Sequence, residues 1–290
     1  MMRKGGTRPV IRLLSLALAL AILLGAYIFL ACNGSLWYPA AKAAVGYEPP
    51  ALAALGRGEE TQAWTIEALL EREHVFFSNV LMLVNESHPL PDGYAPDLTE
   101  YNGAKMNPLM VDSYISLRDA VQVRTGVRIY VSSDYRTSEE QAEILASSEE
   151  GIAAKLGCSE HEAGLALDVY APYFAGEKFL NSPAGRMVNN VCGDYGYIIR
   201  YPKEKEYVTG IRYEPWHLRY VGEPHARIMM ESGLTLEEYL DLLIPDVWYL
   251  SGEYLICRQR GETFTLPTGW SECHVSPDNT GYFVITLKMP

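Results

Sequence analysis

The chain has 290 residues, of which 48% are hydrophobic and 21% are charged, and its formal net charge is -12. A chain of this length can bury a full core, and its composition is that of a globular protein rather than a disordered one. The acidic balance argues against nucleic acid or an anionic membrane surface as the main partner.

The N-terminal segment has the pattern of a membrane-targeting sequence. Its four cations come first: Arg3, Lys4, Arg8 and Arg12. An uncharged, mostly apolar run over residues 13–31 follows, long enough as a helix to nearly cross a hydrocarbon core of about 30 Å. We therefore expect a signal anchor over residues 1–31, with the remaining chain outside the cell. The alternative is a lipoprotein signal, because residues 29–32 resemble a lipobox that ends at Cys32.

The rest of the chain divides into three expected parts. Residues 32–63, rich in proline, alanine and glycine, are predicted to be a linker, and residues 64–245 a catalytic domain. Aromatic and β-branched segments over residues 246–290 indicate a small β extension. Within the domain, apolar periodicity predicts helices over 64–73, 110–123 and 231–243, strands over 80–84, 127–132 and 166–170, and a helix running into a strand over 188–199.

Apart from Cys32, four cysteines follow the targeting segment, and an even number in an exported protein favours disulfides. We expect the local pairs Cys158–Cys192 and Cys257–Cys273, since each pair falls within one predicted part. The alternative for Cys158 is a zinc thiolate, because it lies three residues before His161.

Two short stretches carry the candidate chemistry, residues 159–168 and 213–220. His161, Asp168 and His217 can supply three zinc ligands, which leaves a fourth position open, as in catalytic zinc sites. Glu214 lies three residues before His217 and suits a general base. Arg136 follows a predicted strand and precedes a helix that we expect Ser138 to cap together with Gln141, so its side chain can point into a cleft and stabilise an oxyanion.

Both stretches resemble the VanY-like D-alanyl-D-alanine carboxypeptidases, zinc peptidases of the M15 type that trim peptidoglycan stem peptides. The matching motifs are Ser-x-His-x-x-Gly-x-Ala-x-Asp over residues 159–168 and Glu-Pro-Trp-His-x-Arg-Tyr over residues 214–220. Further matches lie at residues 85–91, 135–141 and 200–202, so the resemblance covers roughly residues 75–225. It departs from the family pattern at Asp134, where glycine is common, and at Cys158, where tyrosine is common.

The resemblance implies a fold and a set of roles. The fold would be α+β, with a small antiparallel sheet that carries the zinc site and helices packed against it, as in hedgehog-type domains. His161, Asp168 and His217 would bind Zn²⁺, Glu214 would be the base and Arg136 the transition-state stabiliser. Ser159 and Gln141 match positions that help to hold the substrate. We expect Glu160 and Glu162, which flank His161, to support the site or to face solvent.

The leading hypothesis is a membrane-tethered, extracellular enzyme with a monomeric catalytic domain that removes the terminal D-Ala from peptidoglycan stem peptides. A second hypothesis in the same class is an L,D-carboxypeptidase that acts on tetrapeptide stems. A third, from a different class, is a non-catalytic zinc-containing module that binds the cell wall. The joint presence of Glu214 and Arg136 argues against the third hypothesis, because a binding module needs neither group.

Overall fold

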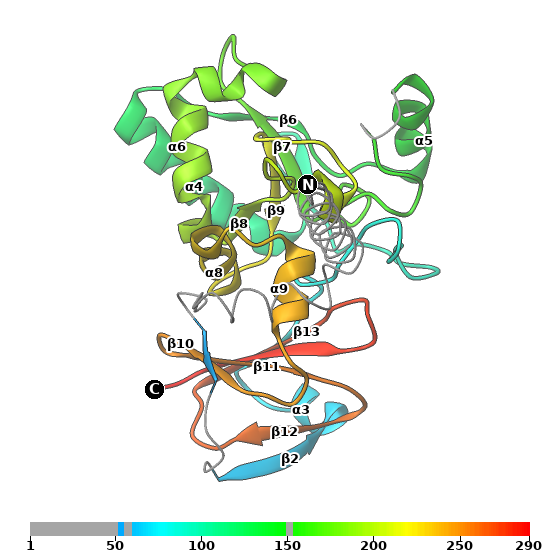
Figure 1. Ribbon diagram of the computed structural model, residues 1–290, viewed down its shortest axis with the longest axis vertical. Helices are drawn as coiled ribbons and strands as arrows, with labels where there is room; N and C mark the ends of the chain where they lie inside the picture. The colour runs from blue at the N-terminus through cyan, green and yellow to red at the C-terminus, as the bar shows by residue number, and fades with distance from the viewer. Residues whose placement is uncertain (1–51, 55–59, 149–152) are drawn as a thin grey trace, which may run out of the picture. The chain divides into compact units, whose positions relative to one another are not determined.

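A four-stranded antiparallel sheet carries the candidate ligands, and its strands are ordered β6-β7-β9-β8. The computed structural model describes residues 52–54, 60–148 and 153–290, all within the unit Pro50–Pro290 (Figure 1). The bounds of the four strands are Tyr130–Ser133 for β6, Ala166–Tyr170 for β7, Tyr197–Ile199 for β8 and His217–Tyr220 for β9. The strand predicted over residues 166–170 is thus confirmed.

One face of this sheet packs on helices, and the opposite face carries the polar residues. Leu167, Val169 and Leu218 are fully or almost fully buried in one core cluster with Leu117 and Val188 of two helices. These helices are α4 (Val111–Thr125) and α6 (Pro183–Val191). Because side chains alternate along a strand, Asp168 and His217 lie on the face away from this core. The fold is therefore a mixed α+β fold with an antiparallel sheet, as expected.

Short elements complete this part of the chain, and most follow local sequence signals. The remaining helices are α5 (Ser138–Ser147), α7 (Glu206–Thr209), α8 (His225–Ser232) and α9 (Leu236–Leu242), with 3-10 turns η1 (Pro108–Met110), η2 (Gly176–Asn181) and η3 (Cys192–Tyr195). Strands β4 (Thr99–Tyr101) and β5 (Ala104–Met106) form a hairpin. The capping box of α5 lies one residue earlier than expected, at Thr137 and Glu140. The single helix predicted over 231–243 is instead two helices, because Gly233 adopts a left-handed φ of 62° and ends α8.

A second, β-rich part is built from both ends of the described chain. Its larger sheet has the order β1-β10-β11-β14-β13-β3, and β12 pairs with β2 in a separate ribbon. The strands that precede the four-stranded sheet in sequence are β1 (Ala53–Ala54), β2 (Thr61–Thr65) and β3 (Val75–Phe77), with α3 (Ile66–Leu70) between the last two. The later strands are β10 (Tyr249–Ser251), β11 (Tyr254–Gln259), β12 (Thr263–Pro267), β13 (Glu272–Pro277) and β14 (Phe283–Lys288). Residues that we expected in the linker and in the first helix therefore pair with the C-terminal strands (Figure 1).

The apolar run over residues 80–84 connects the two parts, but it is not the strand that we predicted. Leu81 and Leu83 pack into one core cluster, and Met82 and Val84 pack into another. The backbone of this run bonds to side chains and loops instead of a strand: Leu81 N–H donates to Ser276 Oγ, at 3.0 Å. Residues 80–84 are apolar because the segment is buried between two core clusters, although it pairs with no other strand that the structure describes.

The predicted disulfides are wrong, since the four cysteines Cys158, Cys192, Cys257 and Cys273 are all free and buried. Cys257 on β11 and Cys273 on β13 are separated by the whole of β14, which pairs with both strands. Two strand spacings of about 4.8 Å exceed the span of about 7 Å that a disulfide tolerates. Cys192 lies in the core beside α6, while Cys158 lies in the loop before β7, and both side chains are buried.

The predicted signal anchor over residues 1–31 and its alternative at Cys32 lie outside the described residues. Among the residues that the structure describes, there is no helix with the length and apolar character needed to span a membrane.

Candidate metal centre

Three side chains from one sheet and one loop converge on a common point. Asp168 lies opposite His217 in the antiparallel pairing of β7 and β9, and His161 lies in the turn that leads into β7. Asp168 Oδ1 is 3.0 Å from His217 Nδ1 and 3.4 Å from His161 Nε2. One ligand atom from each of the three residues lies within 4.8 Å of the others. Residues far apart in sequence thus form the three-ligand cluster that the motifs predict.

Hydrogen bonds on the far sides of the imidazoles orient both rings toward this point. His161 Nδ1 is 2.7 Å from the backbone oxygen of Asp134, and His217 Nε2 is 3.4 Å from Glu160 Oε2. The inner atoms are His161 Nε2 and Asp168 Oδ1, both buried and without a hydrogen-bond partner among the described residues. Buried polar atoms are rarely left in this state, and a zinc ion held by two imidazoles and a carboxylate would satisfy both.

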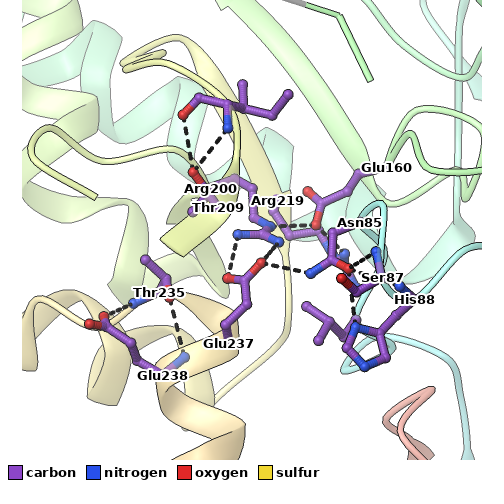
Figure 2. Close-up of polar contacts among 12 residues, drawn as sticks. Asn85, Ser87, His88, Glu160, Arg200, Thr209, Arg219, Thr235, Glu237 and Glu238 are labelled. Carbon is purple, nitrogen blue, oxygen red and sulfur yellow. Dashed lines mark hydrogen bonds and ion pairs between the residues drawn. The ribbon is translucent and has the colours of Figure 1, made fainter. Parts of the chain in front are cut away.

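Glu160 anchors a buried charge network behind His217, a role that sequence reasoning did not single out. Figure 2 shows its carboxylate beside Arg200 and Arg219, whose guanidinium nitrogens lie 2.6 and 2.7 Å from Glu160 Oε1. Arg200 also pairs with Glu237 of α9, at 2.6 Å. Burial by itself would raise the pKa of Glu160, but the two arginines hold it far below its usual range. The network therefore keeps a fixed anion against the outer nitrogen of a candidate ligand.

Glu162, the other acidic neighbour of His161, faces away from the cluster. Its carboxylate accepts hydrogen bonds from Ser138 Oγ and from the backbone N–H of Gly157. It therefore ties the loop to the start of α5, as a supporting residue would. The sequence contains both partners of Glu160, because Arg200 and Arg219 belong to the later motifs. No spacing rule predicts that these three residues meet, so the role of Glu160 could not be derived from the sequence.

Glu214 has the position and the environment of a general base. Its Oε2 lies 3.8 Å from His217 Nδ1, on the loop just before β9. The pKa of Glu214 is raised to about 7, mainly by burial and also by the nearby Asp168 carboxylate, while His217 and Arg136 oppose this rise. A carboxyl group whose pKa lies near neutrality can both accept and return a proton.

Arg136 reaches the same cluster from the opposite side. Its Nη2 lies 3.4 Å from Asp168 Oδ2, and its Nε donates to Ser133 Oγ at 3.1 Å. Burial lowers the pKa of Arg136, although neighbouring carboxylates partly offset this effect. Gln141 is fully buried, accepts a hydrogen bond from Arg136 Nη1 at 2.9 Å and donates one to the oxygen of Ala154. Gln141 therefore positions Arg136 and has no exposed surface for direct contact with a substrate.

A cavity of about 170 Å³ opens onto the cluster. Its walls include the three candidate ligands together with Glu214, Arg136 and Ser159. Ser159 Oγ accepts a hydrogen bond from the backbone N–H of His161, at 3.3 Å. The structure thus brings every predicted site residue except Gln141 to one cavity.

Comparison with known proteins agrees with this geometry. The family model VanY, described as D-alanyl-D-alanine carboxypeptidase, matches residues 103–223. A D-alanyl-D-alanine carboxypeptidase of Enterococcus faecium is 35% identical over 205 residues, which are 65% of this chain and 64% of that protein. The bifunctional D-Ala-D-Ala dipeptidase and D-Ala-D-Ala carboxypeptidase VanXYC of Enterococcus gallinarum is 35% identical over 192 residues, which are 58% of this chain and 97% of that protein.

Solved structures extend the match. The D,D-dipeptidase VanXYg, in complex with a D-Ala-D-Ala phosphinate analogue, has a TM-score of 0.65 and 26% identity, covering 80% of this chain and 99% of that one. A zinc complex of a VanY D,D-pentapeptidase variant has a TM-score of 0.50 and 33% identity, covering 56% of this chain and 98% of that one. The L,D-carboxypeptidase LdcB has a TM-score of 0.53 and 33% identity, covering 57% of this chain and 87% of that one. This chain belongs to the VanY family of D-alanyl-D-alanine carboxypeptidases.

Proposed function

We propose that this protein is a zinc-dependent D-alanyl-D-alanine carboxypeptidase that removes the terminal D-Ala from peptidoglycan stem peptides. The observation that carries the proposal is the convergence of His161, Asp168 and His217 on one point, beside a carboxylate with a raised pKa. The E. faecium and E. gallinarum relatives, named for activity on D-Ala-D-Ala, support the substrate class.

The three converging residues would hold the zinc through His161 Nε2, His217 Nδ1 and a carboxylate oxygen of Asp168. The metal would supply Lewis acidity, which polarises an amide carbonyl and lowers the pKa of water in the site. The hydrogen bonds from the two imidazoles to the backbone oxygen of Asp134 and to the Glu160 carboxylate support this ligand set, because such outer partners fix the orientation of metal-binding imidazoles.

Glu214 and Arg136 would carry the proton and charge steps. Glu214 accepts a proton from the water as its oxygen bonds to the carbonyl carbon, and then delivers that proton to the nitrogen of the leaving D-Ala, so that the C–N bond breaks after the C–O bond has formed. Arg136, held by Ser133 and Gln141, faces the cavity from the other wall and stabilises the negative charge that develops on the carbonyl oxygen. Ser159 lines the same cavity and contacts the terminal part of the substrate.

We also propose that the enzyme works outside the cell, tethered through residues 1–31, with a monomeric catalytic domain. The cluster of cations before a long apolar run supports the tether. Attachment through a lipid on Cys32 remains the alternative form of the same tether. A substrate in the cell wall requires this location.

An L,D-specific activity on tetrapeptide stems is the second candidate. The likeness to the L,D-carboxypeptidase LdcB favours it specifically, because that structure matches as much of the chain as the VanY structure does. Both activities would use the same ligands, base and arginine. The two activities differ in the length of the stem and in the residue before the cleaved bond, which is D-Ala in the pentapeptide and a different, L-configured residue in the tetrapeptide.

Incubating the purified protein with zinc and with a pentapeptide stem, a tetrapeptide stem or free D-Ala-D-Ala tests these proposals. We expect D-Ala release from the pentapeptide, loss of release after chelation, and recovery on adding zinc. Release from the tetrapeptide alone would move the assignment to L,D-specificity. If no amino acid were released from any substrate, a non-catalytic wall-binding module would become the better description.

A further inference from the structure

A second and larger hollow, of about 340 Å³, lies beside the metal centre. Strands β6 and β7, the β4–β5 hairpin and helix α4 form its walls. Its lining includes four tyrosines and two arginines: Tyr101, Tyr114, Tyr130, Tyr170, Arg118 and Arg128. We propose that this tyrosine–arginine pocket binds a carboxylate-bearing residue of the substrate that precedes the cleaved bond, an inference that depends on the proposed peptidase function.

One face of the sheet links the pocket to the candidate metal centre, although the two hollows share no lining residue among those that the structure describes. Tyr170 follows Asp168 by two residues on β7, so both side chains lie on the same face, about 7 Å apart along the strand. Tyr130 on β6 pairs with Tyr170, and their rings lie 5.7 Å apart. Asp134 lines the pocket, and its backbone oxygen orients His161. A peptide leaving the metal centre along this face would therefore meet the tyrosine pair first.

Arg128 is the group that we expect to recognise an acid. Arg118 is already engaged, because it pairs with Asp119 at 2.7 Å and donates to the hydroxyl of Tyr101. Arg128 instead lies over the Tyr130 ring, 5.8 Å from its centroid, and its buried Nε has no hydrogen-bond partner in the described part of the chain. A guanidinium with an unmet donor favours a carboxylate ligand, because the two groups form charge-assisted hydrogen bonds.

The geometry also limits where that acid stands in the substrate. An extended peptide advances about 3.3 Å per residue. Tyr130 lies opposite Tyr170, and Arg128 lies two residues earlier in the same chain, away from Asp168. A carboxylate two to four residues before the cleaved bond can therefore reach Arg128. The rings of Tyr130 and Tyr170 would pack against the intervening residue, since 43% of Tyr130 is exposed.

Two peptides that end in D-Ala-D-Ala test this inference. They differ only in carrying glutamate or glutamine at the third residue before the cleaved bond. With the full-length protein, we expect kcat/KM to be at least about fivefold higher for the glutamate peptide, as a partly exposed charge-assisted contact allows. In Arg128→Gln the ratio should fall to about one. The matched control Arg124→Gln, which changes an exposed arginine of α4 outside the pocket, should keep the wild-type ratio.

The ratio separates recognition from folding, because general damage lowers both rates together. Equal rates for the two peptides in the wild type, or an unchanged ratio in Arg128→Gln, would overturn the inference. If neither peptide were hydrolysed, the proposed function would fail. The affinity of the protein for the two peptides would then test this inference on its own. Fluorescence anisotropy of both peptides, labelled at the N-terminus, would then have to show tighter binding of the glutamate peptide that is lost in Arg128→Gln; equal binding would refute it.

Discussion

Asp168 faces three other residues of the candidate metal centre. One carboxylate oxygen faces both imidazoles, and the other faces Arg136. Burial alone would raise the pKa of Asp168, but the neighbouring His161 and His217 hold it far below its usual range. The residue thus stays an anion, which is the form that ligates a metal.

Glu214→Gln tests the assignment of the base. The amide keeps nearly the same shape but cannot accept a proton, so we expect kcat to fall by about 10³-fold. Zinc content, measured by mass spectrometry of the purified protein, should stay at the wild-type level, because Glu214 is not among the three candidate ligands. The exposed Glu177→Gln serves as the control and should leave D-Ala release unchanged. A Glu214→Gln protein with near wild-type kcat would show that another group moves the proton.

Glu160→Gln tests the buried network behind His217. The substitution removes the charge that faces Arg200 and Arg219, and breaking a buried ion pair costs about 3–5 kcal/mol. The outer hydrogen bond to His217 also weakens, so zinc affinity should fall by about 10- to 100-fold. Urea denaturation and a zinc-competition titration measure the two effects. Glu162→Gln, whose partners lie away from the ligands, should change stability without the loss of zinc affinity; equal losses would contradict the positioning role.

At the scale of single residues, the sequence was sufficient to predict the site residues that belong to short motifs with a fixed spacing. His161, Asp168, His217, Glu214 and Arg136 all reach the same cavity. Gln141 and Glu160 have roles that depend on partners brought together only by the fold. No periodicity or local spacing encodes such contacts, so sequence reasoning could name these residues but not their partners.

The turn between His161 and β7 is the element on which the ligand geometry depends. Gly164 has a φ of 70°, and a Cβ there would lie 2.8 Å from Leu98 Cδ2 and 3.1 Å from Pro96 Cβ. Its backbone N–H donates to the oxygen of His161. Glycine is thus required both for the left-handed conformation and for the close approach of residues 96–98.

Gly164→Ala should therefore destabilise the protein by about 2–4 kcal/mol, the sum of backbone strain and overpacking. Gly126→Ala is the matched control, because Gly126 has a similar φ of 72° with no described atom near its missing Cβ. The control should cost only about 1–2 kcal/mol. Urea denaturation of both variants gives the difference. Equal losses would mean that the contact with residues 96–98 adds nothing to the strain of the turn.

Elements with a regular period and clear caps could be predicted, and elements defined by distant partners could not. Strand β7 matches its predicted bounds, and α4 overlaps nearly all of its predicted range, whereas α6 begins five residues before the predicted range of 188–199. The run over residues 80–84 has the composition of a strand, yet its neighbours on both sides are core clusters rather than strands. An apolar composition indicates that a segment is buried, but not that it pairs as a strand. The run over residues 80–84 is buried without pairing with any of the described strands.

At the scale of the whole molecule, the β-rich part and the catalytic part share a continuous buried boundary. Arg258 of β11 donates to the oxygen of Leu240 in α9, and Asn279 donates to the oxygens of Leu83, His88 and Pro89. Because Glu237 of α9 also pairs with Arg200, the boundary lies only a few contacts from the metal centre. Unfolding of the β-rich part should therefore be coupled to the catalytic part.

His225 lies at the centre of this boundary. Its Nδ1 is 2.7 Å from the hydroxyl of Tyr239 in α9, and its Nε2 is 2.9 Å from Thr286 Oγ1 in β14. Burial lowers the pKa of His225 to about 3, with a smaller contribution from His274. In the unfolded chain the imidazole would titrate near its ordinary value of about 6.5.

This difference fixes the sign of a pH effect on stability. As pH falls below about 6.5, the unfolded state takes up a proton that the folded state does not bind until about pH 3. The free energy of unfolding should therefore fall by up to about 1.4 kcal/mol per pH unit, or about 2 kcal/mol between pH 7 and pH 5. Urea denaturation at both pH values, with chelator present throughout so that metal binding does not contribute, measures the total change. In His225→Gln the change should be smaller by about 2 kcal/mol, whereas His274→Gln, which removes a half-exposed imidazole on β13, should retain most of it. An undiminished change in His225→Gln would place the acid sensitivity of this boundary in another group.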